Sequence, residues 1–217
     1  MEPLWLSQYP PGIPADIDIH EFASLTDVLL ASCQRFDDLP AYSNMGTSMS
    51  YAELERSSRH FAAYLQKSLG LRRGDRVALM MPNLLQYPVA LFGVLRAGMV
   101  VVNVNPQYTV PELEHQLLDS GAVAIVVLEN FAHTLQAVLQ RNLALSPIVI
   151  TTEVGDLLPL ARELLTNAVV KYVKHLVPPW KIAGAIEFNA ALRAGRGQAL
   201  DAVPLCHDDT AFLQYTG

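Results

Sequence analysis

The chain is poor in cysteine, in charged residues and in aromatic side chains. Its only two cysteines, Cys33 and Cys206, are too few for a disulfide framework and fit a reducing compartment. Cys33 lies in the apolar stretch LLASCQRF and is expected to be a small buried residue. Charged residues make up 17% of the chain and the net charge is −6, so we predict no nucleic-acid partner, which would need a basic face.

Most sequence patterns that mark a catalytic site are also absent. The chain has no G-x-S-x-G nucleophile elbow and no cysteine and histidine spacing typical of a metal site. The nearest approach to a dinucleotide fingerprint, Gly195-Arg196-Gly197, lacks the third glycine and does not follow a predicted strand. We therefore predict neither a catalytic residue nor a metal ligand within this chain.

The opening residues and one long uncharged run bear on location. Residues 1–22 are rich in proline and lack the basic start and long apolar run of a secretory signal, which predicts an extended arm. That arm either wraps its own domain or binds a partner, such as a second copy in a homodimer. The uncharged run from Val77 to Leu95 contains two prolines, so we expect strand, turn and helix rather than a membrane span. We predict a cytoplasmic location.

Three segments show the pattern of a capped helix start. Ser24, Ser50 and Thr109 each stand three positions before an acidic residue. In this arrangement the hydroxyl and the carboxylate satisfy free backbone donors in the first turn. We predict helices after these residues, the second stopping near Gly70 and the third at Gly121.

From residue 76 onward, runs of valine and isoleucine alternate with helical patterns. RVALMM, MVVVNVN, AVAIVVLE and PIVIT predict strands, and YPVALFGVLRAG, PELEHQLLDSG and FAHTLQAVLQRNL predict helices between them. Continuous apolar strands separated by helices are typical of a parallel sheet. The predicted fold class is α/β, with a mostly parallel sheet and helices on both faces.

The segment DDTAFLQYTG predicts one more buried strand, followed by a glycine turn. In open α/β sheets, ligands bind beyond the carboxyl ends of the strands. Tyr215, Thr216 and Gly217 follow the predicted strand, so their backbone N–H groups and a hydroxyl are available to a phosphate. A turn without a ligand is the alternative.

Residues 160–177 show a different pattern, which predicts one helix. Apolar pairs recur every four residues, so the apolar stripe drifts by about 40° per repeat. Lys171, Lys174, Trp180 and Lys181 lie in or near this segment. Together with its aliphatic residues they give the combination of basic, aromatic and apolar side chains found in helices that bind at a membrane interface. We predict contact with a membrane surface or a lipid. The alternative is a core face with solvated lysines, and a drifting stripe that buries its first half and exposes its second would combine the two.

Several stretches resemble the adenylate-forming acyl-CoA synthetases. These are MGTSMSYAELERSSRHFAAYL, the run from GLRRGDRVALMMPN to QLLDSGA, and DDTAFLQYTG. The segment VVKYVKHLVPPWKIAGAIEFNAAL is similar to the bacterial long-chain-fatty-acid–CoA ligases. The resemblance extends from about Leu25 to Gly217 and implies the large N-terminal domain of an adenylating enzyme, with residues 1–22 as an arm and 23–217 as an incomplete part of that domain.

The resemblance also implies a reaction. A long-chain fatty acid and ATP would give an acyl-adenylate and pyrophosphate, CoA would then displace AMP, and Mg²⁺ would neutralise phosphate charge. In the family, a loop rich in Gly, Thr and Ser holds the ATP phosphates, and Tyr215, Thr216 and Gly217 match its first positions.

From this match we expect a role in fatty acid metabolism, on the inner face of the cell membrane, and no activity of these 217 residues alone. Two alternatives stay open. One is another acyl- or aryl-acid adenylating ligase. The other is a non-catalytic scaffold or interaction module.

Overall fold

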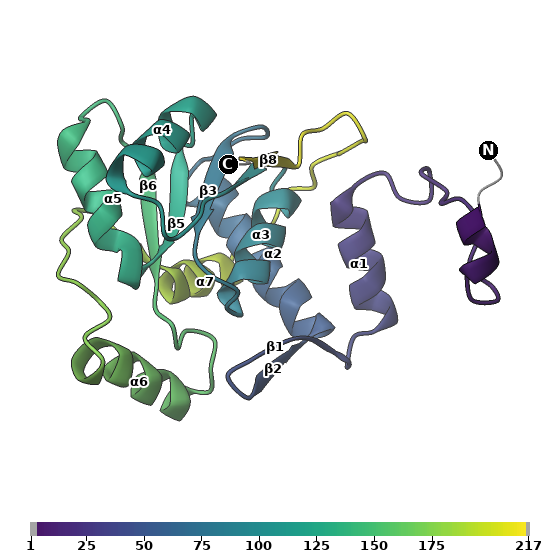
Figure 1. The fold of residues 1–217 in the computed structure, drawn as a ribbon, viewed down its shortest axis with the longest axis horizontal. Helices are drawn as coiled ribbons and strands as arrows, with labels where there is room; N and C mark the ends of the chain where they lie inside the picture. The colour runs from purple at the N-terminus through teal and green to yellow at the C-terminus, as the bar shows by residue number, and fades with distance from the viewer. Residues whose placement is uncertain (1–3, 216–217) are drawn as a thin grey trace.

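The computed structural model describes residues 4–215, and Figure 1 shows the arrangement of their helices and strands. The elements up to the first long strand are η1 (Leu4–Gln8), α1 (Leu25–Arg35), β1 (Pro40–Asn44), β2 (Thr47–Ser50), α2 (Tyr51–Lys67) and β3 (Arg76–Met80). They are followed by α3 (Gln86–Arg96), β4 (Val100–Asn103), α4 (Val110–Ser120), β5 (Ala124–Leu128), α5 (Glu129–Arg141) and β6 (Ile148–Thr152). The last are α6 (Leu160–Ala168), the π-helical turn η2 (Val169–Val173), β7 (Ile186–Glu187), α7 (Phe188–Arg196) and β8 (Phe212–Gln214).

One parallel sheet organises the described residues, and it confirms the predicted fold class. Its strands lie in the order β7-β6-β5-β3-β4-β8, and every neighbouring pair is parallel. The chain passes from β3 to β4 on one side and then crosses back to β5 on the other. The strand order therefore reverses at β3, the central strand of the predicted set.

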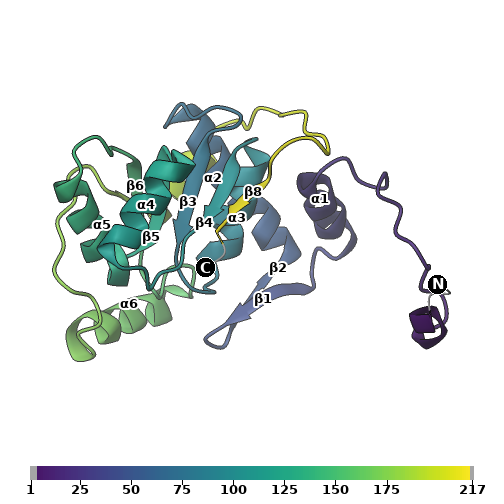
Figure 2. The ribbon, with the colours of Figure 1, turned by 45° about the horizontal axis from the view of Figure 1, so that its top comes forward.

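The alternation of side chains along the strands sends helices to both faces. Val77 and Leu79 belong to the core beneath α2, α3 and α7, whereas Ala78 and Met80 belong to the core beneath α4 and α5. Successive side chains of a strand point to opposite faces, so an unbroken apolar run needs a cover on each. Figure 2 shows α4 and α5 on one side of the sheet and α2 and α3 on the other.

The predicted helix starts and stops are confirmed. In α2, the Glu53 backbone N–H donates to the Ser50 hydroxyl, and the Ser50 N–H donates to the Glu53 carboxylate at 2.8 Å. Thr109 and Glu112 form the same reciprocal pair at α4. Gly121 ends α4 with a φ of 59°, a left-handed conformation that glycine adopts at little cost.

Two parts of the fold were not predicted. β1 and β2 form an antiparallel hairpin, and α7 packs against α2. The contact between α7 and α2 is so close that a Cβ atom at Gly195 would lie 1.9 Å from the His60 carbonyl oxygen. In the Gly195-Arg196-Gly197 run, Gly195 therefore allows the close packing of α7 on α2.

The arm extends away from the sheet. Figure 1 shows η1 and the following residues beyond α1, far from the helical layers. Apolar side chains along it are exposed, and Ile17 reaches 83%. Residues 4–19 do not fold over the domain. At its end, His20 stacks on His207, whose Nε2 lies 2.7 Å from the Phe22 carbonyl oxygen. Cys33 is buried, as predicted.

The predicted helix over 160–177 is wrong at its end, and the alternative of a core face is wrong as well. α6 stops at Ala168, the π-helical turn follows, and His175 adopts a left-handed backbone with a φ of 50°. Neither α6 nor η2 contains a buried residue in the described structure. The combined alternative, with a buried first half, also fails because α6 lies apart from both helical layers, at the lower left of Figure 1.

Candidate functional site

The candidate site lies at the carboxyl edge of the sheet, around the reversal in strand order. In open α/β sheets this is where the loops from neighbouring strands diverge and leave a crevice for a ligand. The sheet order brings the ends of β3, β4, β5, β6 and β8 to this edge. Two polar clusters and one cavity occupy it.

The first cluster joins α3, β4 and β8. The Tyr87 hydroxyl donates to Asn103 Oδ1 at 2.9 Å, and Asn103 Nδ2 donates to Gln214 Oε1 at 3.1 Å. Gln116 Nε2 donates to the Asn103 carbonyl at 2.8 Å. Burial raises the pKa of Tyr87, so its phenol stays protonated and able to donate at neutral pH. Sequence reasoning missed this cluster because its members lie on four separate elements.

Tyr215 is the one predicted phosphate-loop residue within the described range, since Thr216 and Gly217 lie outside it. Its hydroxyl donates to Asp119 Oδ2 at 2.6 Å, at the end of α4. Burial and this carboxylate raise the pKa of Tyr215 to about 12. β8 thus brings Tyr215 to the carboxyl edge, where the sequence predicted a phosphate contact. That contact stays a prediction.

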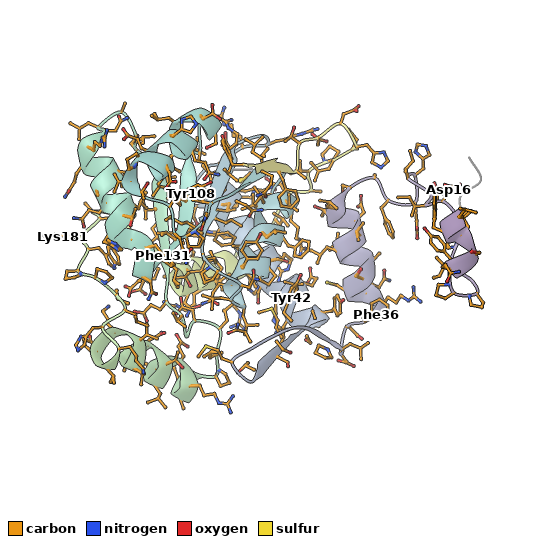
Figure 3. All side chains as sticks on the ribbon, in the orientation of Figure 1. Asp16, Phe36, Tyr42, Tyr108, Phe131 and Lys181 are labelled. Carbon is orange, nitrogen blue, oxygen red and sulfur yellow. The ribbon has the colours of Figure 1, made fainter. Side chains whose placement is uncertain are left out.

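A cavity of about 370 Å³ lies between the β1–β2 hairpin and the start of α3. Tyr42, Asn83, Tyr87 and Phe92 are among its lining residues, and Asn44 Nδ2 donates to the Asn83 carbonyl at 3.0 Å. Figure 3 labels Tyr42 near the hairpin. The hairpin turn, Met45-Gly46, has positive φ at both positions, the geometry that pairs twisted strands. Only Gly46 could have signalled this turn in the sequence, because methionine rarely adopts a positive φ.

A larger cavity, of about 920 Å³, lies at the opposite edge of the sheet. Arg73, Gly98 and Ala211, which precede β3, β4 and β8, line it together with the start of α1. Arg73 forms an ion pair with Asp209 there, which ties the turn before β3 to the loop before β8. Size alone does not make this cavity the site, because the amino ends of parallel strands lie away from the usual ligand crevice.

The second polar cluster lies where β5 and β6 end. Glu129, Glu153 and Asp156 are close together, and Lys171 from η2 reaches Glu129 at 3.4 Å and Glu153 at 3.8 Å. Burial, and then the neighbouring carboxylates Glu129 and Asp156, raise the pKa of Glu153 to about 7. Burial also raises the pKa of Asp156, although its carboxylate accepts from the Thr152 hydroxyl at 2.7 Å. Nothing in the sequence pattern pointed to this cluster.

Metal binding finds no support in the described side chains. Among residues 4–215, no group of three or more His, Cys, Asp or Glu is arranged to hold a metal ion. Glu129 and Glu153 instead pair with Lys171. Asp156 accepts from the Thr152 hydroxyl and the Glu153 backbone N–H. We therefore assign no ligand of Mg²⁺ to this part of the chain.

The predicted lipid-contact residues do not form a single group. Lys171 points to Glu129 and Glu153 at the sheet edge, whereas Lys174 is exposed and Trp180 is half-buried. The Lys181 backbone N–H donates to the Gln136 side chain of α5, and Figure 3 shows its side chain at the outer edge of the molecule. Beside them, large apolar side chains of α6 and η2 are exposed: Leu160, Leu164, Leu165, Tyr172 and Val173. Within residues 4–215, no helix is both long enough and apolar enough to cross a membrane.

Curated proteins similar to this chain include long-chain-fatty-acid–CoA ligases. The chain is 55% identical over all 217 residues to a long-chain-fatty-acid–CoA ligase of Yersinia pestis and 52% identical to one of Salmonella typhi, covering 38% of each. It is 33% identical over 214 residues to a long-chain-fatty-acid–CoA ligase of Bacillus subtilis, covering 98% of this chain and 37% of that protein. The chain thus spans well under half the length of these relatives.

Solved structures share the fold. A benzoate CoA ligase from Burkholderia xenovorans matches 88% of this chain and 32% of its own, with a TM-score of 0.66 and 23% identity. A fatty acyl CoA synthetase of Mycobacterium tuberculosis matches 88% of this chain and 32% of its own, with a TM-score of 0.57 and 22% identity. The family model of AMP-binding enzymes matches residues 29–217, so the chain belongs to the AMP-binding enzyme family.

Proposed function

We propose that the protein containing this chain is an ATP-dependent, AMP-forming long-chain fatty acid–CoA ligase. The observation that carries the proposal is identity above 50% over the whole chain to bacterial proteins of that name. ATP and the fatty acid would form an acyl-adenylate and pyrophosphate, and CoA would then displace AMP. The residues described here would form the sheet edge against which ATP binds.

Within this reaction, the chain's own contribution is positional. β8 carries Tyr215 to the carboxyl edge, beside β4. A loop that begins there presents its backbone donors at the place where parallel sheets bind phosphates. Mg²⁺ would supply charge neutralisation for the phosphates, and its ligands are not assigned here.

The test is ATP–pyrophosphate exchange by the full-length protein, with oleate and with benzoate. We expect exchange with oleate and much less with benzoate. Preference for benzoate would favour the aryl-acid alternative, to which the solved benzoate ligase belongs, although 23% identity supports only the fold. No exchange with either acid would favour the non-catalytic module. The 217-residue chain alone is expected to show none, because stabilising the transition state needs several donors at once.

We also propose that the outer face of α6 and η2, with Lys174, Trp180 and Lys181, contacts the inner surface of the cell membrane. The exposed leucines of α6 and the exposed Tyr172 form the apolar part of an interfacial surface, with the half-buried Trp180 following in the chain, and the two lysines give it positive charge. Lys171 is not included among the proposed membrane contacts, because its ammonium group lies against the carboxylates of Glu129 and Glu153.

Vesicle co-sedimentation of the full-length protein tests this contact. Each lysine contributes about 1 kcal/mol on an anionic bilayer, so replacing Lys174 and Lys181 by Gln should weaken binding roughly thirtyfold. Lys67→Gln, on α2, is a control that removes one positive charge from a different helix. Equal sedimentation with anionic and neutral vesicles at low salt, or full binding by the double variant, would contradict the proposal.

The arm gives a third proposal, a homodimer formed through residues 1–22. Its exposed apolar side chains, including Trp5 and Ile13, are unburied within one chain, and burying them against a second copy would be favourable. Light scattering on the full-length protein with and without residues 1–22 tests it. A dimer that persists without the arm would contradict this assignment.

A further inference from the structure

The strand that leads to the proposed phosphate loop is weakly held by the sheet. β8 has three residues, and among the described strands only β4 pairs with it. None of those residues is buried, whereas every position of β5 is. Hydrophobic burial therefore stabilises β8 less than the central strands, and another interaction has to define where its carboxyl end points.

On the face toward α3, that interaction runs through Asn103. Asn103 stands directly opposite Gln214 in the register of β4 and β8, and its amide nitrogen donates to the Gln214 side chain. Its side-chain oxygen accepts from Tyr87 on α3. Both polar atoms of the Asn103 side chain are thus used, and the end of β8 is linked through β4 to a helix of the core.

On the face toward α4, a different bond holds the next residue. Successive side chains of a strand alternate between faces, so Tyr215 points away from the Gln214 side. Leu213 and Tyr215 both pack on the α4 side of the sheet. The Tyr215 hydroxyl donates to Asp119 at 2.6 Å, and the raised pKa of this phenol preserves the bond across the physiological range.

We propose that these two contacts form a clamp that positions ATP. The clamp consists of Tyr87, Asn103 and Gln214 on one face and Asp119 and Tyr215 on the other. Asn103 and Asp119 are positioning residues: they touch no substrate, and they orient the strand end from which the phosphate loop starts. The inference rests on the proposed function, because that function places the ATP phosphates at this loop.

The clamp should affect ATP more than the fatty acid. Small misplacements of binding groups are costly in phosphate sites, because several donors must reach the oxygens together. Loss of one or two hydrogen bonds at Asn103 should raise the KM for ATP by about tenfold. The KM for the fatty acid should stay unchanged, since the clamp restrains only the end of β8.

The experiment measures ATP–pyrophosphate exchange by the full-length protein in matched variants. Asn103→Ala removes both side-chain bonds. Asn105→Ala is the control, because Asn105 is exposed and its side chain accepts only from the nearby Gln107 backbone. Asp119→Ala removes the second contact from a surface position, and Asp119→Asn retains an oxygen that accepts from Tyr215. We expect Asn103→Ala and Asp119→Ala to raise the KM for ATP, and Asp119→Asn and Asn105→Ala to resemble the wild type.

A second measurement separates positioning from general damage. Amide hydrogen exchange should quicken at residues 211–215 in Asn103→Ala and stay unchanged in β5. An unaltered KM for ATP in both alanine variants overturns the clamp, as does an equal rise in the KM for the fatty acid. If Asn103→Ala does not fold, the comparison of Asp119→Ala with Asp119→Asn tests the clamp instead. A wild-type protein without ATP-dependent exchange refutes the proposed function itself, an outcome distinct from an active wild type with unaffected variants.

Discussion

The parallel sheet and the α6–η2 segment are both rich in apolar residues, but these side chains are buried in the sheet and exposed in α6 and η2. In β5 and its neighbours, the apolar side chains are buried on both faces by helices. In α6, leucines at helical spacing stay exposed, with Leu164 at 63%. The segment is attached by polar contacts instead, among them Lys171 to Glu129, Asn167 Oδ1 accepting from the Gly155 N–H, and Asn130 Nδ2 donating to the Leu176 carbonyl.

This difference shows that apolar periodicity predicts a helix and does not by itself predict burial. A helix face is covered only if another element with a matching surface lies next to it. α2 meets that condition because α3 and α7 pack on it, and α6 does not. The predictions below test the contrast between a segment held by burial and one held by polar contacts.

The largest effect is expected in the sheet core, at Phe61. This residue is fully buried in α2, and its ring lies 5.0 Å from that of Phe188 on α7. Phe61→Ala should lower the free energy of unfolding by about 3–5 kcal/mol, because it removes buried surface and leaves a cavity. Denaturant unfolding of the full-length protein measures the change, and a loss below about 1 kcal/mol would contradict the described packing.

The next effect concerns the close approach of α7 to α2. Gly195→Ala would place a methyl group against the His60 carbonyl, which is backbone and does not rotate away. We expect a loss of about 1–3 kcal/mol in the free energy of unfolding from overpacking. Gly197→Ala is the control, since nothing lies near a Cβ atom at that position. Equal stability of the two variants would show that α7 packs differently.

A smaller, pH-dependent effect is expected where the two regions meet. The pKa of Glu153 is about 7 in the folded chain, against an ordinary 4.5. Between these values the folded state holds a proton that the unfolded state has released, so the free energy of unfolding should fall as pH rises through this window. After discounting for solvent screening of a side chain that is 36% exposed, the fall is roughly 1–2 kcal/mol.

Glu153→Gln isolates this contribution. The amide resembles the protonated acid, so the variant should match the wild type near pH 5 and exceed it near pH 8. Asp156 keeps a raised pKa and gives a remaining slope of the same sign, whereas the lowered pKa values of Asp209 and Glu112 act only in more acidic solution. Parallel pH profiles of the two proteins would contradict the assignment to Glu153.

The smallest effect should come from α6. Leu164→Ala removes an exposed side chain, so the free energy of unfolding should change by less than about 0.5 kcal/mol. The same variant should weaken vesicle binding if the outer face of α6 meets a membrane. A loss comparable to that of Phe61→Ala would show that Leu164 is covered in the full-length protein and would remove the contrast between the two regions.

The sequence by itself determined the elements of the sheet and their class. Continuous valine and isoleucine runs need a cover on both faces, and hydroxyl and glycine caps mark helix ends locally, so strands from β3 to β6 and the starts of α1, α2 and α4 followed from short windows. The strand before Tyr215 was found in the same way. These features depend on neighbours in the chain, which a sequence displays directly.

Only the tertiary structure decided the polar clusters and the exposure of α6. Asn103 meets Gln214 across 111 positions, and Lys171 meets Glu129 across 42, so no local pattern joins them. The same holds for Gly195. Position 195 requires glycine because a Cβ atom there would collide with the backbone of α2. Chain folding brings such groups together through the order of the strands, and that order depends on the summed burial of all elements rather than on any one segment.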